Sequence, residues 1–268
     1  MDQLEFRIID FPEESLYKTA VLVLGVHRAV LVDAGFRLSD GRRLAQEVER
    51  SGRRLSAVVV SHGDPDCYFG AEALRDAFPE VPVLAPARVI ERIEETYAAK
   101  RTAWAHLGGE LSTRLVDLEP LPTGEAIELE GHRLELRGAE LGLPEHHYLW
   151  EHRSRSVLGG VLLYQDLHVW TADTPHAAER EAWIDLLDGI EALDPAFVAA
   201  GHRRAGGATD GTAVRWTRDY LKAFETELGK SPDAAGAEAG LRRRYPDAGL
   251  PYAAELGTKV AKGEVPWA

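Results

Sequence analysis

The first third of the chain alternates short apolar segments with polar ones. Runs of Val, Ile and Leu at residues 4–9, 19–24 and 29–32 have the length and composition of β-strands. Residues 42–49 predict a helix, and residues 55–60 form a short apolar strand of the kind that is buried on both faces. Consecutive strands that are followed by a helix and a further strand are typical of a layered α/β protein.

The remainder of the chain continues this alternation. Further strands are predicted at residues 81–84, 126–129, 132–137, 148–150, 155–158 and 197–200. Apolar positions at helical spacing predict helices that include residues 72–78, 87–111, 183–190, 214–228, 234–243 and 251–262. This order predicts sheets inside and helices outside. The polar loops at residues 61–69 and 201–206 each follow a short buried strand, where α/β proteins usually bind ligands.

Composition and charge exclude several classes of function. The chain has 268 residues, of which 45% are hydrophobic and 28% charged, as in an ordinary globular protein. A net charge of -13 disfavours binding to nucleic acid or to anionic membranes. No apolar run approaches the ~20 residues of a membrane span, and the N-terminus lacks a signal pattern, which predicts a cytoplasmic protein. A lone cysteine, Cys67, cannot form an intramolecular disulfide.

The densest polar cluster is Ser-His-Gly-Asp-Pro-Asp-Cys at residues 61–67, directly after an apolar strand. His62, Asp64 and Asp66 alternate along this loop. Two close carboxylates repel each other unless a cation or a proton lies between them. A metal ion supplies such a cation, and His, Asp and Cys are all competent ligands. The alternative is a polar loop whose aspartates cap the helix that begins near Phe69.

Three segments in order resemble the landmarks of the metallo-β-lactamase fold hydrolases: Leu-Val-Asp-Ala-Gly at 31–35, His-Gly-Asp-Pro-Asp at 62–66 and Ala-Gly-His at 200–202. The resemblance covers nearly the whole chain, and residues 168–174 and 262–267 are similar to a divergent bacterial subgroup. It implies a four-layer αββα sandwich with its site at one edge of the two sheets. We expect one domain over residues 1–268, with a helical insertion at about 87–111 and a C-terminal helical segment at about 211–268.

The resemblance implies that His62, Asp64, Asp66, Cys67 and His202 are metal ligands. Asp64 and Cys67 stand where the family has histidines, and Val161 stands where it has a carboxylate that bridges two metals. Without that bridge we expect one zinc ion or none. The extra carboxylate favours manganese, iron or magnesium, whereas the thiol favours zinc. The family's third histidine falls near Glu140, so whether Glu140, His146, His147 or His168 completes the site stays open.

The expected function is hydrolysis of a small ester, lactone or thioester, with His62, Asp64 and Asp66 as catalytic candidates. Two alternatives remain open: a lyase or cyclase of secondary metabolism that works without a metal pair, and a non-catalytic binding protein. The oligomeric state is also open.

Each site residue also has a structural interpretation. His62 and His202 can fix loop ends, Asp66 can cap a helix, and Cys67 can be a small buried apolar residue. We interpret Asp33 as a structural carboxylate that accepts loop N–H groups. The Trp-Ala-His stretch at residues 104–106 either lines a substrate pocket or packs against the core.

Overall fold

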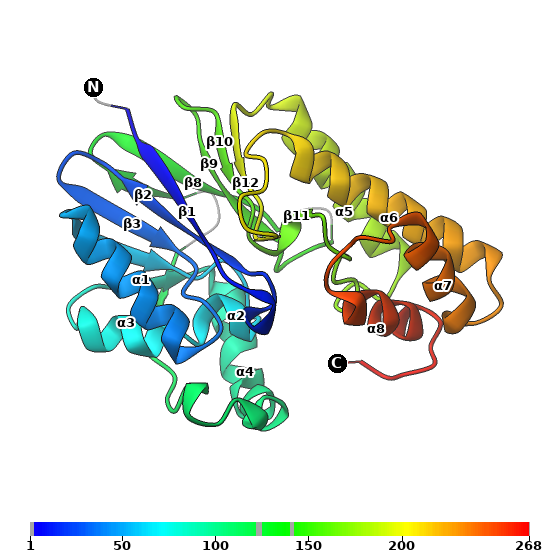
Figure 1. The fold of residues 1–268 in the computed structure, drawn as a ribbon. Helices are drawn as coiled ribbons and strands as arrows, with labels where there is room; N and C mark the ends of the chain where they lie inside the picture. Colours follow the sequence, from blue (N-terminus) through cyan, green and yellow to red (C-terminus); the bar gives the residue numbers. More distant parts are fainter. Residues whose placement is uncertain (1–2, 122–124, 140–141, 268) are drawn as a thin grey trace.

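The computed structural model describes residues 3–121, 125–139 and 142–267. Two main sheets lie face to face with helices on their outer sides (Figure 1). The first sheet contains, in spatial order, β1 (Glu5–Asp10), β2 (Thr19–Leu24), β3 (Arg28–Val32), β4 (Arg54–Val59), β5 (Val83–Ala85) and β6 (Glu119–Pro120). The second contains β12 (Phe197–Ala199), β10 (Ser156–Leu158), β9 (His147–Glu151), β8 (His132–Gly138) and β7 (Ala126–Leu129). Two short strands, β11 (Tyr164–Gln165) and β13 (His202–Arg203), pair with each other.

The helices fall into three groups along the chain. The first group comprises α1 (Leu38–Ser51), α2 (Pro65–Tyr68) and α3 (Ala71–Ala77). The predicted insertion is α4 (Ala87–Ala103) followed by the 3-10 turn η2 (Ala105–Glu110). The third group comprises α5 (Ala177–Ala192), α6 (Thr212–Lys230), α7 (Ala234–Arg244) and α8 (Pro251–Ala261). Further 3-10 turns are η1 (Glu13–Ser15) and η3 (Gly160–Leu162). None of the helices in the described part of the chain is long and apolar enough to cross a membrane.

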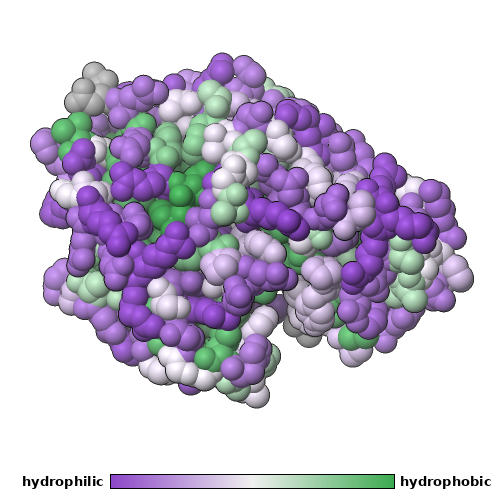
Figure 2. Space-filling view, viewed as in Figure 1, coloured by the Kyte–Doolittle hydropathy of each residue, from purple (hydrophilic) through white to green (hydrophobic). Residues whose placement is uncertain are grey.

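Alternation along the strands produces three apolar layers. In β2, Val21 and Val23 face the second sheet, while Leu22 faces the helices of the first group. The outer face of the second sheet packs under α5 and α6, where Trp183 is buried. Side chains alternate because successive residues of a strand point to opposite faces. The predicted αββα sandwich is therefore confirmed, and most of the surface in Figure 2 is hydrophilic, as the charge implies.

Parallel pairing brings the polar loops together. Strands β3, β4 and β5 are parallel neighbours, so their C-terminal ends meet at one edge of the first sheet. Asp33 follows β3 at φ 64°, and Ser61 follows β4. The polar loop at residues 61–69 and the residues that follow β3 and β4 therefore lie together at this edge of the first sheet.

Residues 160–165 and 202–203 form short elements that the sequence did not predict. Residues 160–162 form the turn η3, in which Gly160 has φ 47°. A Cβ atom on Gly201 would lie 1.7 Å from the Gly160 carbonyl oxygen, so only glycine allows this contact. The two-residue strands β11 and β13 are too short to show periodicity in the sequence.

Candidate functional site

A buried ion pair lies beneath the strand-end edge. Asp33 Oδ1 accepts the Ser61 backbone N–H at 2.9 Å, and Asp33 Oδ2 accepts the Ser61 hydroxyl at 3.0 Å. The Lys18 ammonium donates to Asp33 Oδ2 at 2.6 Å and is fully buried. Burial alone would lower the pKa of Lys18, but the attraction of Asp33 and other acidic groups raises it, so the lysine stays charged. Asp33 thus has the structural role expected from the sequence.

The sequence pattern does not mark Lys18 as a site residue. Its one signal is a lysine directly before an apolar strand, which is usually an exposed strand end. Here residue 18 forms an isolated antiparallel bridge with His202, and the Lys18 Nζ atom lies 3.5 Å from the Gly201 carbonyl oxygen. The segment around residue 201 therefore covers Lys18.

Asp66 and His202 form the second contact of the site. Asp66 lies in α2, and its Oδ2 atom is 2.7 Å from His202 Nε2. The His202 ring stacks on Tyr164 with the ring centres 4.7 Å apart. Burial raises the pKa of Asp66, but the hydrogen bond and charge of His202 and the charge of Lys18 outweigh burial and lower it. Asp66 is therefore ionised and held below the surface.

His62 and Asp64 form a separate pair nearer the surface. Asp64 Oδ2 lies 3.3 Å from His62 Nδ1, and Asp64 Oδ1 accepts from the Lys100 ammonium at 3.1 Å. Lys100, which comes from α4, also donates to the Gly63 carbonyl at 2.8 Å. Burial opposes ionisation of Asp64, but the charges of His62 and Lys100 hold its pKa well below the usual range. Helix α4 thus supplies a cation to the polar loop at residues 61–67.

The structure distinguishes the two adjacent histidines before and in β9. The His146 ring lies 5.9 Å from that of His62 and 4.8 Å from that of Trp183, with 7% of the residue exposed. Burial, and then the charge of His62, lower the pKa of His146 to about 3, so the imidazole is neutral. The Nδ1 atom of His147 instead contacts the Glu145 carbonyl at 3.1 Å.

His168 does not join this group. His168 Nδ1 lies 3.0 Å from the Tyr220 hydroxyl, a structural contact. Glu140 lies outside the described residues. In the insertion, Trp104 packs edge-on against Phe36 at 4.8 Å.

A cleft of about 280 Å³ opens beside Asp64 and His146. Its other lining residues come from α4, from the segment before β9, from residues 172–175, from α5 and from the C-terminal segment: Arg92, Gly142, Leu143, Pro144, Glu145, Ala172, Asp173, Thr174, Pro175, Glu179 and Trp267. Within the described part of the chain, Arg92 has no ion-pair partner. The cleft therefore combines acidic groups with one uncompensated guanidinium.

Asp173 is the cleft residue with the most unusual environment. Its two carboxylate oxygens accept indole N–H groups, one from Trp170 at 2.6 Å and one from Trp267 at 2.7 Å. Burial, and then the charge of Asp64, raise the pKa of Asp173 despite these hydrogen bonds. In the sequence, Asp173 lies within the segment 168–174, and no pattern there predicts its role.

The five predicted metal ligands do not converge on one point. Among residues 3–121, 125–139 and 142–267, no group of three or more His, Cys, Asp or Glu side chains could hold a metal ion. The His62–Asp64 and Asp66–His202 pairs are separate, and lysines already neutralise Asp64 and Asp33. Cys67 is fully buried, with its Sγ atom 4.0 Å from Ser61 Oγ. As placed, the donor set does not fit a resident zinc ion, and the ligand roles of these residues stay predictions.

Cys67 gives a direct test of this arrangement. Burial raises the pKa of its thiol, so little reactive thiolate is present at neutral pH. We expect iodoacetamide to modify the native protein slowly, at the same rate with and without a chelator, and to modify the urea-unfolded protein quickly. Mass spectrometry of the labelled protein measures both rates. Faster labelling after chelation would instead reveal a thiolate that a metal had masked.

Comparisons with known proteins agree with this fold. A β-lactamase domain protein from Burkholderia ambifaria has a TM-score of 0.69 and 16% identity, over 97% of this chain and 84% of that one. A metallo-beta-lactamase family protein from Thermus thermophilus has a TM-score of 0.66 and 18% identity, over 97% and 93% of the two chains. A metallo-beta-lactamase from Pontibacter korlensis has a TM-score of 0.55 and 16% identity, over 76% and 87%. No curated protein matches the sequence.

The two facing sheets and the outer helices define an α/β sandwich of the metallo-beta-lactamase type. The metallo-beta-lactamase superfamily model matches residues 16–202, and the chain belongs to this superfamily. The resemblance found in the sequence is thereby confirmed. The superfamily is largely hydrolytic and typically binds zinc.

Proposed function

We propose that this protein hydrolyses a small ester, lactone or thioester at the cleft beside Asp64. The observation that carries the proposal is the convergence of Asp64, His146 and Asp173, from three separate segments, on one cleft of about 280 Å³. A cleft of this size suits a small molecule. The hydrolytic character of the superfamily supports the reaction class, and the net charge of -13 supports a substrate other than nucleic acid.

The two aspartates of the cleft have opposite electrostatic environments. Lys100 and His62 keep Asp64 ionised, whereas burial and the charge of Asp64 raise the pKa of Asp173. Two carboxyl groups whose pKa values are driven apart are suited to different roles. We assign proton transfer to Asp173 and the fixed negative charge to Asp64.

The proposed reaction uses the side chains of His146, Asp173 and Arg92. Neutral His146 hydrogen-bonds the attacking water, and Asp173 takes one proton from it as the water oxygen bonds to the substrate carbonyl carbon. The oxyanion that forms on the carbonyl faces Arg92. When this intermediate collapses, the bond to the leaving group breaks and the proton passes from Asp173 to the leaving oxygen or sulfur. His62 and Asp66 are positioning residues in this scheme, since they hold Asp64 and His202.

A substrate panel with and without a chelator tests the proposal. We expect turnover of at least one class among small esters, lactones and thioesters, and we expect dialysis against dipicolinate to leave the rate unchanged. Turnover that chelation abolishes and zinc restores would contradict the side-chain mechanism. A substrate that is consumed without uptake of ¹⁸O from labelled water would replace hydrolysis by a lyase or cyclase reaction. Binding without turnover would identify a binding protein.

A further inference from the structure

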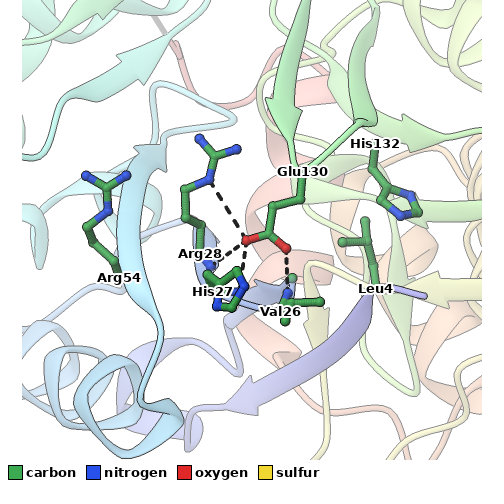
Figure 3. A pocket seen from close by; sticks show the side chains of 8 residues that line it. Leu4, Val26, His27, Arg28, Arg54, Glu130 and His132 are labelled. Carbon is green, nitrogen blue, oxygen red and sulfur yellow. Dashed lines mark hydrogen bonds and ion pairs between the residues drawn. The ribbon is translucent and has the colours of Figure 1, made fainter. Parts of the chain in front are cut away.

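A second cavity, of about 530 Å³, lies at the other end of β3 and β4. Arg28 begins β3 and Arg54 begins β4, whereas Asp33 and Ser61 follow the opposite ends of the same strands. Five or six residues at 3.3 Å each separate the two ends by roughly 17–20 Å. Figure 3 shows the labelled residues that line this cavity: Leu4, Val26, His27, Arg28, Arg54, Glu130 and His132. The cavity is therefore distinct from the cleft beside Asp64.

Glu130 makes the walls of this cavity rigid. Its carboxylate accepts three consecutive backbone N–H groups, from Val26 at 2.6 Å, His27 at 2.9 Å and Arg28 at 2.8 Å. These bonds tie the turn between β7 and β8 to the turn between β2 and β3, and so join the two sheets. A Cβ atom on Gly25 would lie 2.5 Å from Glu130 Oε2, so glycine permits the close approach. The cavity is thus formed before any ligand enters.

The same bonds leave positive charge on the cavity wall. Glu130 is the one carboxylate among the described residues that line the cavity, and its oxygens are engaged by backbone N–H groups. Arg28 Nε lies 3.9 Å from Glu130 Oε1, a loose ion pair. The Arg54 guanidinium has no ion pair with any residue of the described chain. The cavity wall therefore carries one guanidinium without an ion pair among the described residues and one that is loosely paired.

The two arginines are also neighbours across the sheet. Arg28 and Arg54 are register partners on adjacent parallel strands. Both guanidinium groups extend in the same direction in Figure 3. Like charges at opposed positions of neighbouring strands destabilise a sheet. An anion bound by both groups removes this repulsion.

We propose that this cavity binds a small phosphate monoester, with the phosphate group on Arg28 and Arg54. A guanidinium presents a planar fork of N–H donors that matches phosphate oxygens. Two such groups face the dianion against the single negative charge of Glu130, and exposed His27 lies next to them. The cavity exceeds the size of a phosphate ion, and the apolar Leu4 and Val26 side chains offer a surface for the organic part of the ester.

Calorimetric titration of the purified protein with glucose 6-phosphate, glucose and inorganic phosphate tests the proposal. We expect saturable binding of the sugar phosphate and none of glucose. Arg54→Gln and Arg28→Gln should each weaken binding about tenfold or more, because each loses a charge-assisted hydrogen bond. Arg242→Gln is the matched control, since it removes an exposed arginine that is paired with Glu238 in α7. It should bind as the unchanged protein does.

Arg92→Gln distinguishes this cavity from the catalytic cleft and should retain binding. If inorganic phosphate binds as tightly as the ester, the site is supported and its ligand is phosphate itself. Absence of saturable binding to both phosphate compounds would overturn the proposal. So would Arg54→Gln with unchanged affinity, or an equal loss in Arg242→Gln, which would indicate a general charge effect. None of these outcomes depends on the hydrolase proposal, because turnover is not the quantity measured.

Discussion

Asp173→Asn is expected to lower turnover about 10²–10⁴-fold, the usual contribution of a positioned acid–base residue. An amide cannot accept the proton of the attacking water or return it to the leaving group. Steady-state kinetics on the best substrate of the panel measures the loss in kcat. The melting temperature should stay within a few degrees, since the amide oxygen of the substituted side chain still accepts one of the two indole hydrogen bonds.

Trp267→Phe is the matched control for Asp173→Asn. It keeps an aromatic ring in the cleft but removes the N–H that donates to Asp173. Loss of one hydrogen bond to a charged group costs about 1.5–3 kcal/mol, so turnover should fall by no more than roughly 10- to 150-fold. If Trp267→Phe were as inactive as Asp173→Asn, the carboxylate would act only by holding the tryptophan. Asp173→Asn with nearly full turnover would exclude acid–base catalysis by this residue.

The pH dependence of kcat/KM distinguishes a catalytic role of Asp173 from a structural one, because a purely structural residue would not set the position of a limb. The negative charge of Asp64 raises the pKa of Asp173. Asp64→Asn removes that charge, so the pKa of Asp173 should fall. The limb of the kcat/KM profile that reports Asp173 as a base should then shift to lower pH.

Lys18→Met is expected to lower the free energy of unfolding by about 3–5 kcal/mol, because it leaves the buried Asp33 carboxylate without its cation. Lys18 is fully buried and its Nζ atom lies 2.6 Å from Asp33 Oδ2. Urea unfolding, followed by circular dichroism, measures the change in midpoint. Lys259→Met, which removes a partly exposed lysine paired with Glu255, should cost less than about 1 kcal/mol.

The double variant Lys18→Met, Asp33→Asn separates charge from packing. The asparagine introduced at position 33 carries no charge, tolerates the left-handed backbone there, and still accepts the Ser61 N–H. The double variant should therefore recover a large part of the stability that Lys18→Met loses. A Lys18→Met single variant within about 1 kcal/mol of the original protein would show that Lys18 is not the partner of a buried charge.

Sequence patterns predicted the layered fold because its central strands are apolar and its helices carry an apolar stripe. Val21, Leu22 and Val23 show a run buried on both faces, and the structure places such runs inside the sandwich. The polar loop after β4 was recognisable because Ser61 and His62 interrupt an apolar segment abruptly. Local spacing therefore identified the edge at which the site lies.

The partners within the site depend on contacts between distant segments, which no local spacing encodes. Lys100 reaches Asp64 from a helix 36 residues further on, and Asp173 accepts a hydrogen bond from Trp267, which lies 94 residues further on. The sequence left open which of His146 and His147 turns inward. Alternation along a strand shows that the two side chains point to opposite faces, but not which side chain takes which face. The metal-ligand roles were predicted from family landmarks, on the assumption that side chains at matching positions lie close together. Whether they do depends on contacts between segments that are far apart in the sequence.

The closure of the site by residues 200–202 has a consequence for folding order. The Thr19 hydroxyl donates to the Ala200 carbonyl, 181 residues away, and Asp66 contacts His202 across 136 residues. Contacts of such long range form after the local ones, because closing a long loop costs entropy before any contact rewards it. During synthesis, Lys18 in the first sheet therefore stays uncovered until the segment around residues 200–202 emerges from the ribosome. Assembly of the site is a late event, and any pause between the two halves prolongs exposure of the internal charges.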